Sequence, residues 1–385
     1  MENFFRILFK FLWLGCTSFG GPVAHIGIFH RQFVEKENQL SEEDYATLLA
    51  LCQIIPGPSS SQVGMGLGYR IGGFSGSLAA WVGFTLPSAI LMYLGALWIL
   101  EDGSLASGWF VLAMKLVAVG IVSQAVLGMW SQLCVTRETK LVALIAAVIF
   151  YSAPAGLTQV GLIAAALIAG YVSQPIEPLK VFHEPRYWKV VIWGLMIWAV
   201  GVIASSLVAS DSQWLSMISG HYLSGALVFG GGHVVLPLLE AEFVPPLQVD
   251  IFLAGYGFAQ AMPGPLFTLA SYLGPVLIPE STLLAALVAT TGIFLPGAIL
   301  LLVALSLGQH LMHWKSRLVF VNAVVVGLLF AILVNPIFTE AVDSEVTTAL
   351  AVLSLIVAVA LKRSPLELVV VMIATTFFVN QFGWI

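Results

Sequence analysis

The sequence predicts an all-α polytopic membrane protein with about thirteen transmembrane helices in two inverted-topology repeats, with broken helices at Pro-Gly-Pro segments. Three observations predict this fold class. The chain of 385 residues is 59% hydrophobic and only 9% charged, which excludes an ordinary soluble composition. Apolar runs of about 20 residues recur along the whole length. Three motifs occur twice in the same order, which indicates an internal duplication.

The apolar runs end at charged or Pro/Gly-rich breaks, and a helix of about 20 such residues crosses a hydrocarbon core of roughly 30 Å. The predicted spans are 8–30, 45–69, 74–100, 109–133, 139–153, 156–173, 190–209, 216–239, 251–273, 282–308, 318–338, 346–361 and 365–382. Treating a Pro-Gly-Pro segment as re-entrant rather than as a kinked span would change the count.

The distribution of lysine and arginine predicts the orientation, because these residues collect in cytoplasmic loops. With the N-terminus in the cytoplasm and the C-terminus in the periplasm, twelve of the 15 lysines and arginines lie inside. Arg31 and Lys36 fall in an outer loop, and Lys115 falls within the fourth span. The twelve inner residues are Arg6, Lys10, Arg70, Arg137, Lys140, Lys180, Arg186, Lys189, Lys315, Arg317, Lys362 and Arg363.

The duplication predicts two transporter repeats, at residues 1–175 and 216–385, joined by a linker and an additional span within 176–215. Three segments recur after 210, 207 and 209 residues. They are Phe-Gly-Gly-Pro and Phe-Gly-Gly-Gly, beginning at 19 and 229; Gln-x-x-Pro-Gly-Pro, beginning at 53 and 260; and Gly-x-x-x-Pro, ending at 87 and 296. With six spans in each repeat, a direct fusion would leave the two repeats parallel. The additional span therefore gives the second repeat the opposite orientation in the membrane. Inverted repeats are typical of secondary transporters, whose sites lie at broken helices.

The Pro-Gly-Pro segments predict a site for a small oxyanion. Pro56 and Pro58 lack backbone donors and Gly57 allows a sharp turn, so a helix that resumes at Ser59 presents free N–H groups and a partial positive charge. Ser60 and Ser61 add hydroxyl donors. The second copy, Pro263-Gly264-Pro265, keeps the break but supplies only Thr268, and Gln53 and Gln260 precede the two breaks. The alternative is that both segments are proline kinks that serve helix packing.

The Phe-Gly-Gly segments also interrupt helices, although small residues here can equally serve close helix packing. Ionisable residues follow both copies and are candidates for function because such groups are costly in a membrane. Arg31 can bind an anion through its guanidinium fork, while His25 and His233 can exchange protons. Arg31 is alternatively a headgroup-region charge, and Lys115 is either an anion ligand or a snorkelling lysine. The coupling candidates are His25, Glu35, His233, Glu240 and Glu242.

These motifs together resemble the chromate ion transporter family in its long form with two homologous halves. The resemblance is carried by FGGPVAHIGIFHRQFV and QIIPGPSSSQVG with their second copies, FGGGHVVLPLLEAEFV and QAMPGPLFTLASYLG. It implies secondary export of chromate across the bacterial inner membrane, with sulfate as a competing oxyanion. The residues that match the family motifs are Gly20, Gly21, Pro22, His25, Arg31, Pro56, Gly57, Pro58, Gly230, Gly231, Gly232, Pro263, Gly264 and Pro265.

Two other functions are considered. An oxyanion importer or channel, for sulfate or another oxyanion, can use the same broken helices. An intramembrane enzyme is disfavoured because the chain has no H-E-x-x-H, no G-x-S-x-G and no Walker A motif. The three cysteines lack metal-ligand spacing, so we expect no metal and no cofactor. The expected partners are the oxyanion and membrane lipid, without nucleic acid, and the sequence leaves a homodimer open.

Overall fold

The computed structural model describes residues 2–101, 108–154, 156–173, 187–207, 212–229, 232–244, 247–308, 311 and 316–383, and these residues contain helices but no strand. The first half contains α1 (Glu2–Thr17), α2 (Gly21–His30), η1 (Arg31–Lys36), α3 (Glu42–Ile54), α4 (Ser59–Glu101), α5 (Trp109–Leu133), α6 (Arg137–Ser152) and α7 (Gly156–Ser173). The helix α8 (Trp188–Leu207) connects it to the second half. The second half contains α9 (Gln213–Leu227), η3 (Gly232–Val234), α10 (Val235–Phe243), α11 (Val249–Ala261), η4 (Leu266–Thr268), α12 (Leu269–Leu277), η5 (Pro279–Ser281), α13 (Thr282–Leu307), α14 (Val319–Ile332), η7 (Leu333–Phe338), α15 (Thr339–Ala341), α16 (Glu345–Leu355), η8 (Ile356–Ala360) and α17 (Pro365–Gln381).

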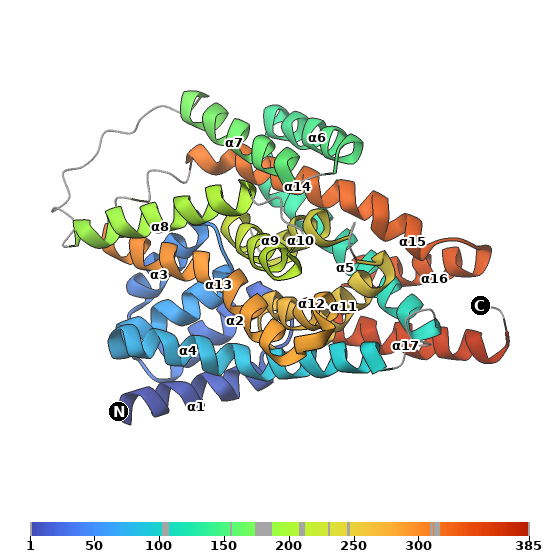
Figure 1. The fold of residues 1–385 in the computed structure, drawn as a ribbon, viewed down its shortest axis with the longest axis horizontal. Coiled ribbons are helices and arrows are strands. Elements are labelled where there is room, and N and C mark those ends of the chain that lie inside the picture. Colours follow the sequence, from blue (N-terminus) through green and yellow to red (C-terminus); the bar gives the residue numbers. More distant parts are fainter. Residues whose placement is uncertain are drawn as a thin grey trace.

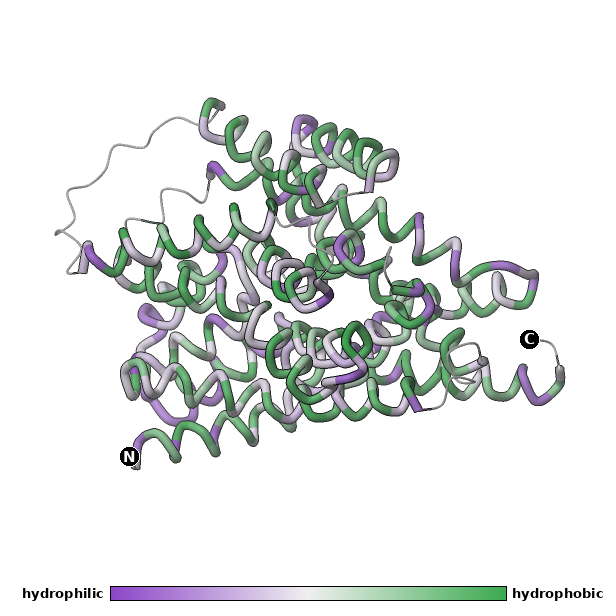
Figure 2. The backbone as a smooth tube through the Cα atoms, viewed as in Figure 1, coloured by the Kyte–Doolittle hydropathy of each residue, from purple (hydrophilic) through white to green (hydrophobic). Residues whose placement is uncertain are grey.

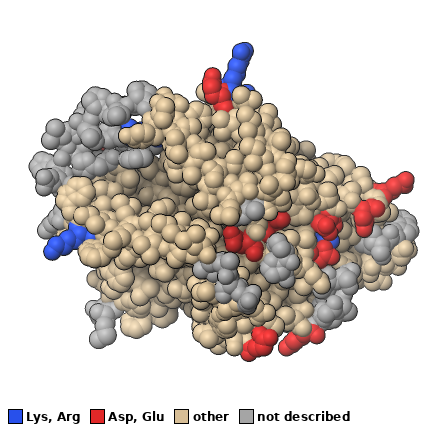
Figure 3. Space-filling view, turned by 45° about the horizontal axis from the view of Figure 1, so that its top comes forward, with Lys and Arg blue, Asp and Glu red and all other residues tan. Residues whose placement is uncertain are grey.

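The helices are those of a multi-pass membrane protein. Hydrophobic residues run along nearly every helix (Figure 2), and most of the surface in Figure 3 carries no charge. Within the described ranges, 5 helices are long and apolar enough to cross a membrane. They are Ser59–Glu101, Trp109–Leu133, Trp188–Leu207, Pro279–Leu307 and Ser316–Ala341.

The predicted first span, 8–30, is a helical hairpin rather than one crossing helix. The helix α1 ends at Thr17, and α2 begins at Gly21 after Gly20 and Gly21 adopt φ of 99° and 73°. The helix α2 returns along α1, since the ring of Phe29 lies 5.7 Å from that of Phe11. Two successive residues with positive φ reverse the chain because they cannot continue a right-handed helix.

The predicted second span, 45–69, is also a hairpin. The helix α3 ends before the Pro-Gly-Pro segment and α4 returns beside it, so that a Cβ on Gly66 would lie 2.5 Å from Leu48 Cδ1. A second reversal follows within α4, at Gly72 and Gly73, where Gly73 has a φ of 63°. The 43 residues of α4 are therefore two helical segments, and only the second, after Gly73, is long enough to cross a membrane.

The second half repeats both hairpins in place of the predicted spans 216–239 and 251–273. The ring of His221 on α9 lies 4.6 Å from that of Phe243 on α10, which fixes α9 and α10 as one hairpin. In the next hairpin, Gly255 on α11 packs against the ring of Tyr272 on α12. These four differences share one cause. The hydropathy of a segment reports how long an apolar run is, but not whether the chain turns back within it.

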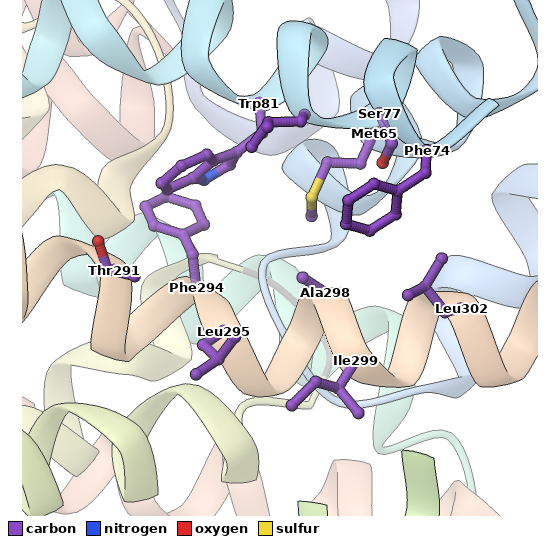
Figure 4. Close-up of a pocket in the computed structure, with 11 residues that line it drawn as sticks. Met65, Phe74, Ser77, Trp81, Thr291, Phe294, Leu295, Ala298, Ile299 and Leu302 are labelled. Carbon is purple, nitrogen blue, oxygen red and sulfur yellow. The ribbon is translucent and has the colours of Figure 1, made fainter. Parts of the chain in front are cut away.

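The second segment of α4 and its counterpart α13 run antiparallel. The rings of Trp81 and Phe294 lie 5.8 Å apart, and the Tyr93 and Thr282 hydroxyls lie 3.1 Å apart. Figure 4 shows the same order, with Phe74 near Leu302. Between the two helices lies an apolar groove of about 380 Å³.

The remaining helices interlock the two halves. In the first half, α5 packs against α16 and α17, whereas α14 of the second half packs against α6 and α7 (Figure 1). Helices of each half therefore pack against helices of the other half.

Candidate functional site

The two Pro-Gly-Pro breaks each bond to the other half. Gly57 N donates to Val228 O over 2.8 Å, and Gly264 N donates to Ser18 O over 2.8 Å. Gly264 corresponds to Gly57, and Val228 corresponds to Ser18, in the repeat. The contact is thus reciprocal, as expected around an approximate twofold axis. It brings all four helix breaks to one place inside the protein.

Four helix starts converge there. A Cβ placed on Gly232, the first residue of η3, would lie 3.0 Å from Pro22 Cγ at the start of α2 and 3.7 Å from Leu266 Cβ at the start of η4. His25 on α2 lies within 3.4 Å of the Ser60 hydroxyl in the first turn of α4. The starts of α2, η3, η4 and α4 are therefore neighbours. The first N–H groups of a helix have no partner within it and carry partial positive charge, so this convergence favours an anion.

His25 connects two of the breaks and is completely buried. Its Nε2 lies 3.2 Å from Ser18 O, and because a carbonyl can only accept, Nε2 carries the proton. The Nδ1 atom of the neutral ring is then an acceptor, which fits the Ser60 hydroxyl 3.4 Å away. The ring also lies edge-on to Phe84, with centroids 5.2 Å apart. His25 therefore fixes the start of α4 relative to the Phe-Gly-Gly break.

Gln62, which the sequence analysis did not select, clamps the first Pro-Gly-Pro break to the second half. Its Nε2 donates to Pro56 O over 3.0 Å and to Gly297 O of α13 over 3.1 Å. Gly57 packs against the same helix, since a Cβ on Gly57 would lie 2.9 Å from Gly297 Cα and 2.5 Å from Gln62 Nε2. A polar amide in an apolar run was the available signal for Gln62. Its partner Gly297 could not be predicted, because it is 235 residues away.

Buried hydroxyls without partners lie on the segments around the breaks. Within the part of the chain that the structure describes, the Oγ atoms of Ser18 and Ser61, the Oγ1 of Thr85 and the Oε1 of Gln62 have no hydrogen-bond partner. A buried polar atom without a partner is costly unless water or a ligand satisfies it. Hydroxyls can donate to an oxyanion, whereas Ser59, at the start of α4, is only half-buried. The first half therefore supplies hydroxyl donors in addition to its backbone N–H groups.

The second Pro-Gly-Pro break differs in its side chains. Thr268 Oγ1 donates to Pro265 O over 2.8 Å, so this hydroxyl bonds to the break itself. A Cβ on Gly264 would lie 2.8 Å from the Ser88 hydroxyl. Gln260 is buried with its side chain beside the Tyr256 hydroxyl, whereas Gln53, its counterpart, is exposed. The two breaks therefore differ in the polar side chains that lie beside them.

The predicted cationic ligands lie elsewhere. Arg31 is exposed on η1, ten residues beyond Gly21 and so roughly 15 Å along the helix. Lys115 is buried in a different pocket of about 460 Å³. Its Nζ lies 2.5 Å from Asp250 Oδ1 and donates to Glu340 O over 3.1 Å. Both side chains are therefore separate from the helix starts.

The predicted coupling residues divide into two groups. Glu35 is exposed and lies 3.2 Å from His30. The His30 ring donates a hydrogen bond to the Glu42 carboxylate, and this bond raises the pKa of His30. Glu240 is 8% exposed and its Oε2 has no partner. Glu242 is half-buried on the same helix. Gly230, Gly231 and the side chain of His233 lie outside the described residues.

Comparison with known proteins identifies the family. The model of the chromate transporter family matches residues 5–172 and again residues 215–379. The chromate transport protein of Pseudomonas aeruginosa is 25% identical over 99% of this chain and 92% of its own length. The chromate transport protein of Cupriavidus metallidurans is 29% identical over 76% of this chain and 71% of its own.

A third relative is also similar over most of its length. The probable chromate transport protein of Synechococcus elongatus is 28% identical over 84% of this chain and 81% of its own length. No solved structure matches the chain. Because the family model covers both halves, and with them all four helix breaks, the chain belongs to the chromate transporter family.

Proposed function

We propose that this protein is a secondary transporter that exports chromate from the cytoplasm across the inner membrane, with sulfate as a competing oxyanion. The observation that carries the proposal is the convergence of four helix starts, joined by reciprocal bonds between Gly57 and Val228 and between Gly264 and Ser18. Such a site holds an anion through backbone N–H groups and hydroxyls. A site without a fixed cationic ligand also releases its anion more readily, as transport requires.

The fold supports an inverted-repeat transporter. Corresponding helices α4 and α13 pack antiparallel (Figure 4), and the breaks occupy corresponding positions in both halves. In inverted-repeat transporters, alternating access is rocking of one repeat against the other around a central site. We infer that the oxyanion binds between the two Pro-Gly-Pro hairpins and that the halves rock about it.

The hairpins also strengthen the proposed orientation. In the predicted topology, Arg31 and Lys36 lay outside. Because α2 returns along α1, both now lie on the same side as Arg6 and Lys10. All of the 15 lysines and arginines except Lys115 then fall on the cytoplasmic side. This agrees with the positive-inside rule more closely than thirteen simple crossings do.

Export is energetically accessible to such a carrier. Moving one charge across 100 mV changes its free energy by about 2.3 kcal/mol. The free energy of a dianion therefore falls by about 4.6 kcal/mol when it leaves a negative interior. That energy supports a gradient of roughly 2,000-fold, because each 1.36 kcal/mol is tenfold. The membrane potential therefore suffices, with or without a coupled proton.

The test is chromate flux in everted inner-membrane vesicles containing this protein, with and without an imposed potential or pH gradient. We expect saturable accumulation inside the vesicles, reduced by added sulfate and lost in Gly57→Val. Passive conductance without saturation would indicate a channel, and accumulation only in right-side-out vesicles would indicate an importer. No flux above empty vesicles, with folded and inserted protein, would refute chromate as the substrate.

A further inference from the structure

Three buried polar side chains without a complete set of partners lie in the hairpin of α9 and α10. His221 and Ser224 are 0% and 1% exposed, and Glu240 is 8% exposed. His221 Nε2, Ser224 Oγ and Glu240 Oε2 have no hydrogen-bond partner among the described residues. Three such atoms in one hairpin require an explanation, because each unsatisfied buried polar group is costly.

The hairpin geometry places these side chains near one another. The rings of His221 and Phe243 are in contact across the hairpin, 4.6 Å apart. One turn further along α9 is Ser224, and one turn back along α10 is Glu240. Because the two helices are antiparallel and residues three apart share a face, Ser224 lies opposite Glu240. The three side chains therefore lie along one stretch of the α9–α10 hairpin, and their unpartnered atoms make no hydrogen bond to one another.

Packing alone does not call for polar side chains here. In the first half, the residues that correspond to His221 and Ser224 are Phe11 and Leu14, and both are completely buried. The first hairpin is thus built with apolar side chains at the same positions. The second half has a histidine and a serine at these positions.

Among the described segments that pack against α10, none carries a cationic side chain of its own. The helix α10 packs against α9, α14, α7 and η3, and none of these segments contains a lysine or arginine. A buried carboxylate without a cation or donor favours its neutral, protonated form. The other titratable groups on these segments are His221, Tyr222, Tyr171, Glu242 on α10 itself, and His233, whose side chain lies outside the described residues. Tyr222 donates to Trp198 O over 3.4 Å, and Tyr171 lies beneath the Arg317 guanidinium.

His221 is arranged to accept a hydrogen bond at Nε2. Its Nδ1 lies 2.7 Å from Met217 O, and since a carbonyl only accepts, Nδ1 carries the proton of the neutral ring. The unpartnered Nε2 then has a free lone pair. A protonated Glu240 carboxyl can donate toward this atom, and the Ser224 hydroxyl can donate toward the carboxylate once the proton has left.

We propose that Glu240, with His221 and Ser224, forms a proton-binding site that couples proton entry to oxyanion export. This inference rests on the proposed function. The carboxylate takes up one proton from the outside, becomes a neutral carboxyl group, and returns the proton to the cytoplasm, where the carboxylate forms again. The oxyanion moves in the opposite direction at the separate site between the Pro-Gly-Pro hairpins.

The experiment uses purified full-length protein in liposomes that enclose a pH-sensitive dye, with the potential clamped by potassium and valinomycin. A chromate gradient should drive proton movement in the wild type. In Glu240→Gln, we expect this proton movement to fall at least tenfold, while exchange of radiolabelled chromate for unlabelled chromate continues. The matched control is Glu280→Gln, which removes an exposed carboxylate of the second half and should retain both activities.

The outcomes separate the inference from the proposed function. Wild-type proton movement in Glu240→Gln, or chromate exchange without proton movement in the wild type, would overturn the inference and leave the transporter intact. Absence of chromate exchange in the wild type would overturn both. If Glu240→Gln does not fold, His221→Phe restores the side chain found in the first half. That variant should shift the pH midpoint of chromate exchange, and an unchanged midpoint would overturn the inference.

Discussion

Gly57→Ala tests the central contact most directly, because the added methyl group has no space. A Cβ at this position would lie 2.5 Å from Gln62 Nε2 and 2.9 Å from Gly297 Cα. The amide can move, but the backbone of α13 cannot move without shifting the whole helix. Gly57 also has a φ of 130°, which costs a residue with a side chain about 1–2 kcal/mol. Overpacking adds about 1–3 kcal/mol.

Together these effects disfavour the joined arrangement of the breaks by roughly 3 kcal/mol, which is more than a hundredfold. Chromate exchange in proteoliposomes should fall by that order, while membrane insertion and elution as a folded protein are retained. Gly264→Ala should cost less, because its nearest atom at 2.8 Å is the Ser88 hydroxyl, which can rotate. Gly161→Ala is the control, since it meets no atom within 4 Å. Equal activity of Gly57→Ala and Gly161→Ala would refute the reasoning.

Three further predictions follow from the hairpins. His25→Ala removes the link between the breaks and should raise the apparent KM for chromate at least tenfold, because the bond to the Ser60 hydroxyl is lost; an unchanged KM would show that the start of α4 is held without it. Arg31→Lys should leave KM within twofold, since Arg31 is exposed and distant from the helix starts, and a large rise would return it to the site. Reporter fusions after Lys36 should indicate the cytoplasm and fusions after Asp343 the periplasm, whereas thirteen simple crossings place both outside.

The positions of the helix breaks could be predicted from the sequence, and the path of the chain between them could not. Proline and positive-φ glycine impose local conformations, so Pro-Gly-Pro and Phe-Gly-Gly predicted breaks that the structure contains. Whether the following helix continues or returns depends on contacts such as Phe11 with Phe29. Such contacts are tertiary and leave no periodic signal in an apolar run. The spans 8–30 and 45–69 were therefore wrong as crossings, although their helical character was right.

The candidate residues show the same division. His25 and the serines after Pro58 were selected because polar groups beside a helix break are costly in a membrane and are therefore candidates for function. The structure places His25 beside Ser60. Arg31 was selected for its charge and for its place in the family motif, and it lies away from the helix starts. Charge identifies residues able to bind an anion, but the proposed anion site is built mainly from backbone groups, which every sequence contains.

The divergence of the two halves explains how a symmetric framework acquires unequal roles. In the first half Gly66 packs against Leu48, whereas in the second Gly255, the counterpart of Leu48, packs against Tyr272. The glycine that allows close packing thus lies on the second helix of the hairpin in the first half and on the first helix of the hairpin in the second half. The hairpin is preserved in both. Gln62 is likewise replaced by Leu269 in the second half, so only the first break is clamped by an amide. In the proposed mechanism, the first Pro-Gly-Pro hairpin, held by Gln62, contributes to oxyanion binding, and the second half carries the proposed proton site at Glu240. Exchange of two ions requires two such separate sites.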